Sequence, residues 1–187
     1  QINNYKNYNV IIKKTTNQDD YFTFINIYKK KMKSIGSNIF YLFSDSYFRN
    51  LFELIKSNGF LILAYKDYKI LVGCIILIDN KNAYYHLSAN LDKSIPGLTN
   101  SLLYKAMQHS SSINLSNFFL GGGNSKSEND NLYKFKEKMA NMKHQYYIGK
   151  KIHNHDIYEF IIKKWENKFP NLKKMYKSHL LKYTNKV

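Results

Sequence analysis

Apolar positions recur at helical spacing in several stretches of the chain, and these stretches predict its helices. Behind the polar run Asn17-Gln18-Asp19-Asp20, apolar residues repeat every three to four positions as far as Gly36. Ser44-Asp45 is typical of a second helix start, and Asn58-Gly59 is typical of a helix end. The predicted helices therefore cover residues 17–36, 44–59 and 98–109, a segment from 130 onward, and two segments after about residue 156 that are separated at Pro170.

Shorter apolar and β-branched runs between these segments predict strands. A turn at Lys66–Lys69 joins two of them into a hairpin, and Gly73 inside the second indicates a bulge or a close backbone contact. The predicted strands are residues 9–15, 60–65, 70–78, 83–89, 115–121 and 144–149. Hairpins followed by a strand–helix–strand crossover predict an α+β fold with a mixed, mostly antiparallel sheet flanked by helices. We expect a domain over residues 1–152 and a Lys-rich helical tail over residues 153–187.

Composition supports a folded domain and narrows its location. Of the 187 residues 44% are apolar, with 17 Tyr and 12 Phe, which is enough to build a core. No stretch reaches the roughly 18 uncharged apolar residues of a membrane-spanning helix. Cys74 is the single cysteine, and no basic-then-apolar leader follows Gln1. We therefore predict a cytoplasmic protein without a disulfide framework.

The formal net charge of +16 is the most unusual feature of the composition. It favours nucleic acid, phosphorylated ligands or anionic membrane surfaces as partners. Lys, Asn, Ile and Tyr are abundant throughout and Arg49 is the single arginine. An AT-rich genome would produce the same pattern without a selected binding surface, so the charge alone leaves both explanations open.

Three consecutive glycines, Gly121, Gly122 and Gly123, mark the most informative stretch. They follow an apolar strand-like run, and a helix predicted from Asp130 comes soon after them. Glycines permit positive φ and close approach of a ligand or another chain segment. Because α/β folds place sites where strands end, we expect a binding site here, with a plain tight loop as the alternative.

The order of these elements is that of the GNAT acyltransferase fold, and four short motifs on it resemble the FemAB-like branch of that superfamily, its C-terminal half in particular. The motifs are Tyr84–Ala89, Leu120–Gly123, Asn131–Lys136 and Tyr147–Gly149, with Phe40–Ser44 fitting the same branch upstream. The resemblance runs from about Val10 to Ile152. It implies an N-acyltransferase that moves an acyl or aminoacyl group onto an amine in cell-wall or surface-glycan synthesis.

The same resemblance implies the donor and the partners. Donors in this branch are aminoacyl-tRNA or acyl-CoA such as acetyl-CoA, and acceptors are amino-sugars or peptidoglycan precursor peptides. Full-length members usually carry two GNAT-like halves, so a further N-terminal GNAT-like domain is an expected partner. The loop from Lys93 to Asn100 lacks the Arg/Gln-x-x-Gly-x-Gly/Ala motif of CoA binders. This departure agrees with a branch in which the donor need not be CoA.

Site residues follow from the position of each motif. In GNAT enzymes the donor lies in a gap between the two central strands, here residues 84–89 and 115–121, and its phosphates lie at the start of the next helix. The residues expected to bind the donor are Leu87, Ser88, Ala89, Gly97, Leu98, Thr99, Asn129 and Phe135. Those expected to bind the acceptor are Gly121, Gly122, Gly123, Asn124 and Tyr85.

Three residues are candidates for the chemistry, each with a plainer alternative. Lys136, in the Phe-Lys pair of the FemAB-like motif, would stabilise the tetrahedral oxyanion, or it is a solvated lysine. His86, on the face that strand alternation shares with Tyr84 and Ser88, would be a general base, or it is a core or rim histidine. Asp130 would accept a hydrogen bond from the substrate amine, or it caps its helix. Phe135 stands where many GNAT enzymes have a proton-donating tyrosine, and Phe cannot donate.

Two further features of the sequence are a histidine cluster near residue 153 and the Lys-rich tail, and neither predicts catalysis. The cluster His153-Asn154-His155-Asp156 has no second group of ligands, so we predict a surface turn and no metal site. The tail is either a docking helix pair or a surface for tRNA phosphates or the inner face of an anionic membrane. From Ile161 to Val187 its lysines are Lys163, Lys164, Lys168, Lys173, Lys174, Lys177, Lys182 and Lys186, against the single acid Glu166. A non-catalytic GNAT-like module that binds RNA or a membrane surface is therefore the rival hypothesis.

Overall fold

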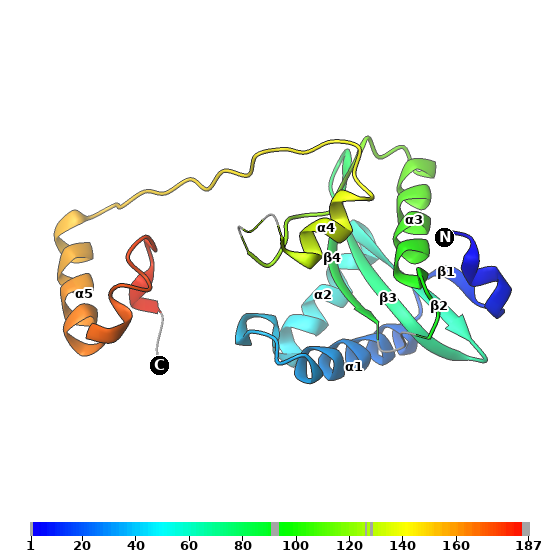
Figure 1. The fold of residues 1–187 in the computed structure, drawn as a ribbon, viewed down its shortest axis with the longest axis horizontal. Helices are drawn as coiled ribbons and strands as arrows, with labels where there is room; N and C mark the ends of the chain where they lie inside the picture. The colour runs from blue at the N-terminus through cyan, green and yellow to red at the C-terminus, as the bar shows by residue number, and fades with distance from the viewer. Residues whose placement is uncertain (1, 91–93, 126, 128, 185–187) are drawn as a thin grey trace. The chain divides into compact units, whose positions relative to one another are not determined.

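The computed structural model describes residues 2–90, 94–125, 127 and 129–184 of the chain (Figure 1). Lys93 of the expected donor loop and Lys186 of the tail lie outside the described residues. The chain divides into two compact units, Gln1–Met142 and Lys143–Val187. The first contains the sheet and the helices packed on it, and it holds every candidate site residue.

A five-stranded sheet forms the centre of the first unit, in the order β1-β2-β3-β4-β5. All neighbouring pairs are antiparallel except β4 and β5, which are parallel. The parallel pair is joined through a crossover helix, as the sequence predicted. The strands are β1 (Ile11–Thr15), β2 (Gly59–Lys66), β3 (Lys69–Ile78), β4 (Asn82–Asn90) and β5 (Asn117–Phe119).

Two helices cover one face of the sheet. They are α1 (Gln18–Ser34) and α2 (Asp45–Asn58), which follows the short 3-10 helix η2 (Ile39–Tyr41). Asn17 and Ser44 cap them by accepting backbone hydrogen bonds, as predicted. Their aromatic residues pack against Leu61, Leu63 and Ile75 of the sheet. Gly73 is needed here, because a Cβ at this position would lie 2.5 Å from Cδ2 of Phe24 in α1.

The other face is covered by α3 (Leu98–Ser112), with the N-terminal 3-10 helix η1 (Asn4–Tyr8) beside it. Leu98, Leu102 and Ala106 of α3 belong to one buried cluster with Ile62, Val72, Cys74 and Ile76 of the strands. Figure 1 shows α3 lying along the sheet, with α4 (Asn131–Glu137) in front of β4. The result is the predicted α+β architecture, with a mixed sheet between two helical layers.

The second unit consists of a segment without regular secondary structure, then α5 (His155–Lys168) and two 3-10 helices, η3 (Pro170–Leu172) and η4 (Lys182–Thr184). Trp165 is its buried anchor and contacts Phe169 and Tyr176. Beside it, Glu166 binds both Lys173 and Lys182. No helix among the described residues is long and apolar enough to cross a membrane.

Two predicted elements are wrong. The strand expected over residues 144–149 is absent, and Tyr146, Tyr147 and Ile148 are exposed in an extended segment. Its alternating side chains favour a strand, but a strand needs a neighbour that satisfies its backbone groups, and no described segment pairs with it. The second tail helix is also missing, because the chain after Pro170 forms 3-10 turns. The strand expected over residues 115–121 is present but short, ending at Phe119.

Candidate active site

The candidate site begins where β4 and β5 separate. Their parallel pairing covers three residue pairs and ends with Tyr84 opposite Phe119, whose rings stack with centroids 5.2 Å apart. Beyond this point the chain leaves the sheet into the three glycines, while β4 continues to Asn90. In the part of the chain that the structure describes, no strand pairs with the outer edge of β4 from Tyr85 to Asn90. Because β3 bonds the backbone groups of alternate residues, every second residue of this stretch, which includes the predicted donor-binding residues Leu87, Ser88 and Ala89, has its N–H and C=O directed to one side of a gap.

The glycine segment and α4 form the other side of this gap. Gly121 has φ of 71°, which favours glycine. Gly123 is required by close packing, because a Cβ there would lie 2.6 Å from Oδ1 of Asp130. Gly122 has open space around its Cα. Two of the three predicted glycines thus have a physical reason, one in backbone conformation and one in close approach.

Asp130 holds this loop in place. Its Oδ1 accepts a hydrogen bond from the backbone N–H of Tyr133 at 2.8 Å, which caps α4. Its Oδ2 accepts from the backbone N–H groups of Asn124 and Ser125 at 2.9 and 3.0 Å. These hydrogen bonds hold the pKa of its carboxyl below the usual range. Of the two roles considered for Asp130, the structure contains the cap.

Lys136 points from α4 back to the glycine segment. Its Nζ donates to the carbonyl oxygen of Gly122 at 2.8 Å and lies 5.5 Å from the centroid of the Tyr85 ring. Burial lowers its pKa, while the negative charge of Asp130 acts in the opposite direction. The lysine is only partly exposed, in contrast to Lys134 on the same helix and to Lys138 at its C-cap. It is therefore not a freely solvated side chain, which was the plainer alternative for this residue.

Tyr85 connects Lys136 to β4. Its side chain packs against the cluster on the α3 face of the sheet, the face that Ser88 shares through its pairing with Cys74. Burial raises the pKa of the phenol, which therefore stays protonated. Lys136, Tyr85 and Ser88 thus form one polar group in the gap, on the side of the sheet where α3 and α4 lie.

His86 lies on the opposite face of the sheet, and a bulge places it there. Ile75 pairs with Leu87 and Ile76 pairs with Tyr85, which leaves His86 as an extra residue in β4. The extra residue reverses the alternation, so that Ser88 pairs with Cys74 on the α3 face while Leu87 packs with α1 and α2. The predicted shared face of His86 and Ser88 is therefore wrong, because simple alternation does not hold through a bulge.

His86 has a partner that the sequence did not indicate. Nε2 of His86 lies 2.6 Å from the hydroxyl of Tyr47 in the first turn of α2. The Tyr47 ring stacks on Phe43, with centroids 4.1 Å apart. Burial lowers the pKa of His86 and raises that of Tyr47. Both effects favour a neutral imidazole and a protonated phenol, and the tautomer of the ring decides which of the two groups donates the hydrogen bond. Tyr47 could have been singled out only as the aromatic residue three positions after the Ser44 cap.

The start of α3 supplies the remaining donor-binding candidates. Gly97 precedes the helix with φ of 76°, and Leu98 and Thr99 form its first turn. The Thr99 hydroxyl accepts a hydrogen bond from Nδ2 of Asn90 at the end of β4. Oδ1 of Asn90 is buried without a hydrogen-bond partner among the described residues. A buried acceptor without a partner fits an amide-bearing ligand that passes along β4 towards the free N–H groups of the helix.

The other two predicted donor-binding residues lie at α4. Asn129 precedes the cap and accepts a hydrogen bond from Nζ of Lys134, and Phe135 is partly buried. The end of α4 is close to the start of α3, because Nδ2 of Asn100 lies 3.8 Å from Sδ of Met139. No group of His, Cys, Asp or Glu among the described residues could hold a metal ion. The histidines of the cluster at 153–156 lie at the start of α5, with Asn154 as its cap.

Solved structures share this fold across most of the chain. An aminoglycoside acetyltransferase from an uncultured soil metagenomic sample, in complex with sisomicin, is 16% identical, with a TM-score of 0.55 over 77% of this chain and 99% of its own. A possible acetyltransferase from Clostridium difficile is 15% identical, with a TM-score of 0.58 over 77% and 99%. A GNAT family acetyltransferase from Staphylococcus aureus is 15% identical, with a TM-score of 0.52 over 76% and 98%. The chain therefore has the fold of GNAT acetyltransferases.

The likeness lies in the fold. No protein-family model matches the chain, and no curated protein matches it significantly by sequence. The solved structures are covered almost completely, so this chain contains the whole of their fold.

Proposed function

We propose that the protein is an N-acyltransferase that moves an acyl group from acyl-CoA to a primary amine of a small molecule. The observation that carries the proposal is the position of Lys136, whose Nζ is held at the Gly122 carbonyl and beside Tyr85 in the gap between β4 and β5. Structures with this fold include acetyltransferases, one of them an aminoglycoside acetyltransferase in complex with sisomicin. This supports an acetyl group as the acyl unit and an amino-sugar as the acceptor.

The donor would lie along the outer edge of β4. Backbone groups near Leu87, Ser88 and Ala89 would pair with its amides, and Oδ1 of Asn90 would accept one further N–H. The free N–H groups at Thr99 and Asn100 would face its phosphates at the start of α3. Acyl-CoA would supply a thioester, whose carbonyl carbon is the electrophile.

The proposed base and the proposed oxyanion-stabilising group would then act from opposite faces of β4. The amine nitrogen attacks the thioester carbonyl carbon, and Nδ1 of His86 takes the proton that the nitrogen loses, in the ring tautomer whose Nε2–H donates to the Tyr47 hydroxyl oxygen. The carbonyl electrons move to oxygen, and the ammonium of Lys136 stabilises the oxyanion. When the oxyanion collapses the C–S bond breaks, and the leaving thiolate is protonated. Tyr85, a protonated phenol next to Lys136, is placed to donate a hydrogen bond to that thiolate, which Phe135 cannot do, and the thiolate then takes a proton from solvent.

A second donor class follows from the resemblance to the FemAB-like branch. The Phe135-Lys136 pair and the net charge of +16 favour aminoacyl-tRNA as donor and a peptidoglycan precursor peptide as acceptor. In that case the same Lys136 would face the aminoacyl ester, and exposed lysines of this basic chain would contact the phosphates of the tRNA. A cytoplasmic site of action near the inner face of the membrane would suit such an acceptor.

One assay tests these proposals together. The full chain is incubated with acetyl-CoA and a panel of amino-sugars and aminoglycosides, and released thiol is measured. A parallel series uses aminoacyl-tRNA with peptidoglycan precursor peptides. We expect transfer from acetyl-CoA that Lys136→Met slows by about 10²- to 10³-fold and that Lys138→Met, which changes an exposed lysine at the C-cap of the same helix, leaves intact. Transfer from aminoacyl-tRNA alone would identify the FemAB-like activity.

A third result would reject catalysis. If neither donor reacts and RNA binding weakens steeply with salt, the protein is the non-catalytic binding module considered above.

A further inference from the structure

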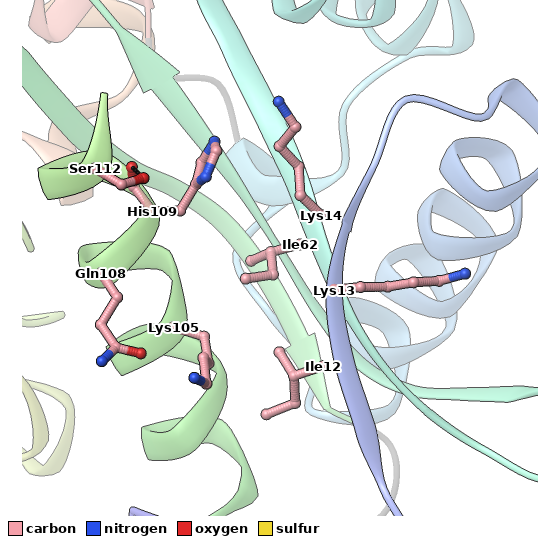
Figure 2. A pocket seen from close by; sticks show the side chains of 8 residues that line it. All are labelled: Ile12, Lys13, Lys14, Ile62, Lys105, Gln108, His109 and Ser112. Atoms are coloured by element: carbon pink, nitrogen blue, oxygen red, sulfur yellow. Dashed lines mark hydrogen bonds between the residues drawn. The ribbon is translucent and has the colours of Figure 1, made fainter. Parts of the chain in front are cut away.

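A second polar site lies away from the proposed active site, between β1 and the C-terminal half of α3 (Figure 2). It is a cavity of about 350 Å³ on the α3 face of the sheet. β1 and β2, which form its floor, lie at the opposite edge of the sheet from β5. Figure 2 shows Ile12 and Ile62 on the floor, with Lys14 on one side and Lys105 and His109 on the helix opposite.

The register of β1 explains which lysine belongs to this cavity. Lys14 pairs with Ile62, whose side chain is in the cluster under α3, so Lys14 points to the cavity side. Lys13 pairs with Leu63, which packs with α1 and α2, and its Nζ lies 4.9 Å from the centroid of the Tyr65 ring. Figure 2 shows the Lys13 side chain directed away from the other lining residues. The two neighbouring lysines of this edge strand thus have different surroundings.

Positive charge in the cavity is not balanced by the protein. None of its eight lining residues is acidic, and Lys14 and Lys105 form no ion pair among the described residues. Other lysines do have carboxylate partners, for example Lys29 with Asp45 and Lys56 with Glu53. Burial and the positive charge of Lys14 lower the pKa of His109, whose ring also packs edge-on against Phe60. The cavity therefore has cations and an apolar floor but no anion.

We propose that this cavity binds a phosphomonoester, with Lys14, Lys105 and His109 around the phosphate and Ile12 and Ile62 under the group that carries it. A dianion supplies the countercharge that the lining residues lack, and the two ammonium groups and the imidazole are the donors that a phosphate needs. The volume of about 350 Å³ is enough for a mononucleotide-sized ligand. The proposal does not depend on the acyltransferase activity, because none of these residues belongs to the proposed active site.

His109 itself reports on the site. A phosphate beside the ring favours the imidazolium, so its pKa rises on binding, by roughly one unit for a close contact. The charged groups that line its surroundings are Lys14 from β1 and Lys105 from its own helix, while β2 contributes the apolar Phe60 and Ile62. The chain contains six histidines, and His153, His155 and His179 are exposed, so their imidazoles serve as internal references.

The test is a titration of the histidine ring protons by NMR in the full chain at about 0.15 M salt, where surface charges are screened. The probes are inorganic phosphate and adenosine 5′-monophosphate. We expect a saturable rise in the pKa of His109, with the reference histidines unchanged. The variant Lys14→Gln with Lys105→Gln should abolish the rise, and Lys13→Gln should retain it. Tighter binding of adenosine 5′-monophosphate than of phosphate would identify a nucleotide as the source of the group, and equal binding would identify free phosphate.

Two results would overturn the proposal. One is a rise that all the histidines share, which would mean general attraction of anions to a basic protein. The other is a His109 response that is absent, or that survives the loss of both Lys14 and Lys105. Circular dichroism of each variant checks that the fold is retained, which the partly or fully exposed positions of both lysines lead us to expect.

Discussion

The hydroxyl of Tyr47 lies 2.6 Å from Nε2 of His86, and this contact joins the first turn of α2 to the middle of β4. It exists because the extra residue in β4 turns His86 towards the face that α2 covers. The contact fixes the orientation of the ring beside the gap between β4 and β5. If His86 is the base of an acyl transfer, Tyr47 is the residue that positions it.

The pH dependence of transfer tests this pair. Burial lowers the pKa of His86 from its usual value of about 6.5, so the ring is neutral at pH 7 and becomes protonated only under more acidic conditions. We expect the rate to fall as the pH drops through this lowered pKa, because a protonated imidazole cannot accept a proton. His86→Gln should remove the acidic limb together with most of the activity, by roughly 10²- to 10⁴-fold.

Tyr47→Phe should act differently from the loss of His86. In the tautomer that leaves Nδ1 free to act as the base, Nε2–H of His86 donates to the Tyr47 hydroxyl and this favours the imidazolium, so removal of the hydroxyl lowers the pKa of His86. The acidic limb of the rate profile should therefore move to lower pH, with the plateau reduced less than in His86→Gln. Tyr41→Phe, which changes an exposed tyrosine near α2, is the matched control. An unchanged limb in Tyr47→Phe would separate this hydroxyl from the chemistry.

Lys136 should matter for rate more than for binding. If its ammonium stabilises the oxyanion, Lys136→Met should lower kcat by about 10²- to 10³-fold with little change in the affinity for acetyl-CoA. Because burial lowers the pKa of Lys136, activity should also fall at alkaline pH earlier than for an ordinary lysine. Rate measurements and calorimetric titration with acetyl-CoA check the two parts. A variant that loses affinity and keeps kcat would assign Lys136 to binding instead.

The glycine segment offers a matched pair of substitutions. A Cβ at Gly123 would lie 2.6 Å from Oδ1 and 2.8 Å from Cγ of Asp130, whereas at Gly122 it would meet nothing within 4 Å. Gly123→Ala should therefore displace the carboxylate that caps α4 and destabilise the fold by about 1–3 kcal/mol. Gly122→Ala should be close to the original protein in thermal unfolding. Equal melting temperatures for the two variants would contradict the role of Asp130 as the centre of this loop.

Much of this architecture could be predicted because it depends on local signals. The caps at Asn17 and Ser44, the hairpin between β2 and β3 and the crossover helix α3 all follow from periodicity and turn residues. The close contact at Gly73 was predictable for the same reason, since glycine inside an apolar strand is rarely neutral. Lys136 was found through the motif that surrounds it, and the structure places it at the glycine segment.

The parts that could not be predicted depend on contacts between distant residues. The bulge at His86 depends on how β4 pairs with β3. No residue in the sequence of β4 predicts its position. Tyr47 therefore had no visible link to His86, 39 positions away. The segment after Met142 has the alternation of a strand, but whether it forms one depends on a neighbouring edge. In each case the sequence indicates which local conformation a segment favours, but the segment that packs or pairs with it determines the structure that forms.

In the second unit one carboxylate, that of Glu166, is shared by two lysines, and we expect the stability of the unit to depend on it. Glu166 binds Lys173 and Lys182 at 2.8 and 2.6 Å, and hydrogen bonds from both lysines lower its pKa. Because the folded pKa is below the unfolded value of about 4.3, this contribution is present above that pH and disappears as the pH falls through the lowered value. Trp165, the single tryptophan, is buried beside Glu166, so its fluorescence reports on this unit alone.

We therefore expect acid to change the Trp165 signal in the original protein, and Glu166→Gln to show the changed signal already at neutral pH. Glu159→Gln, which neutralises an exposed glutamate on the same helix, should behave as the original protein does. Circular dichroism at the same pH values separates the second unit from the sheet domain, since most of the regular structure belongs to the first. If Glu166→Gln kept the neutral-pH fluorescence, the apolar contacts of Trp165 with Phe169 and Tyr176 would suffice to hold the unit together.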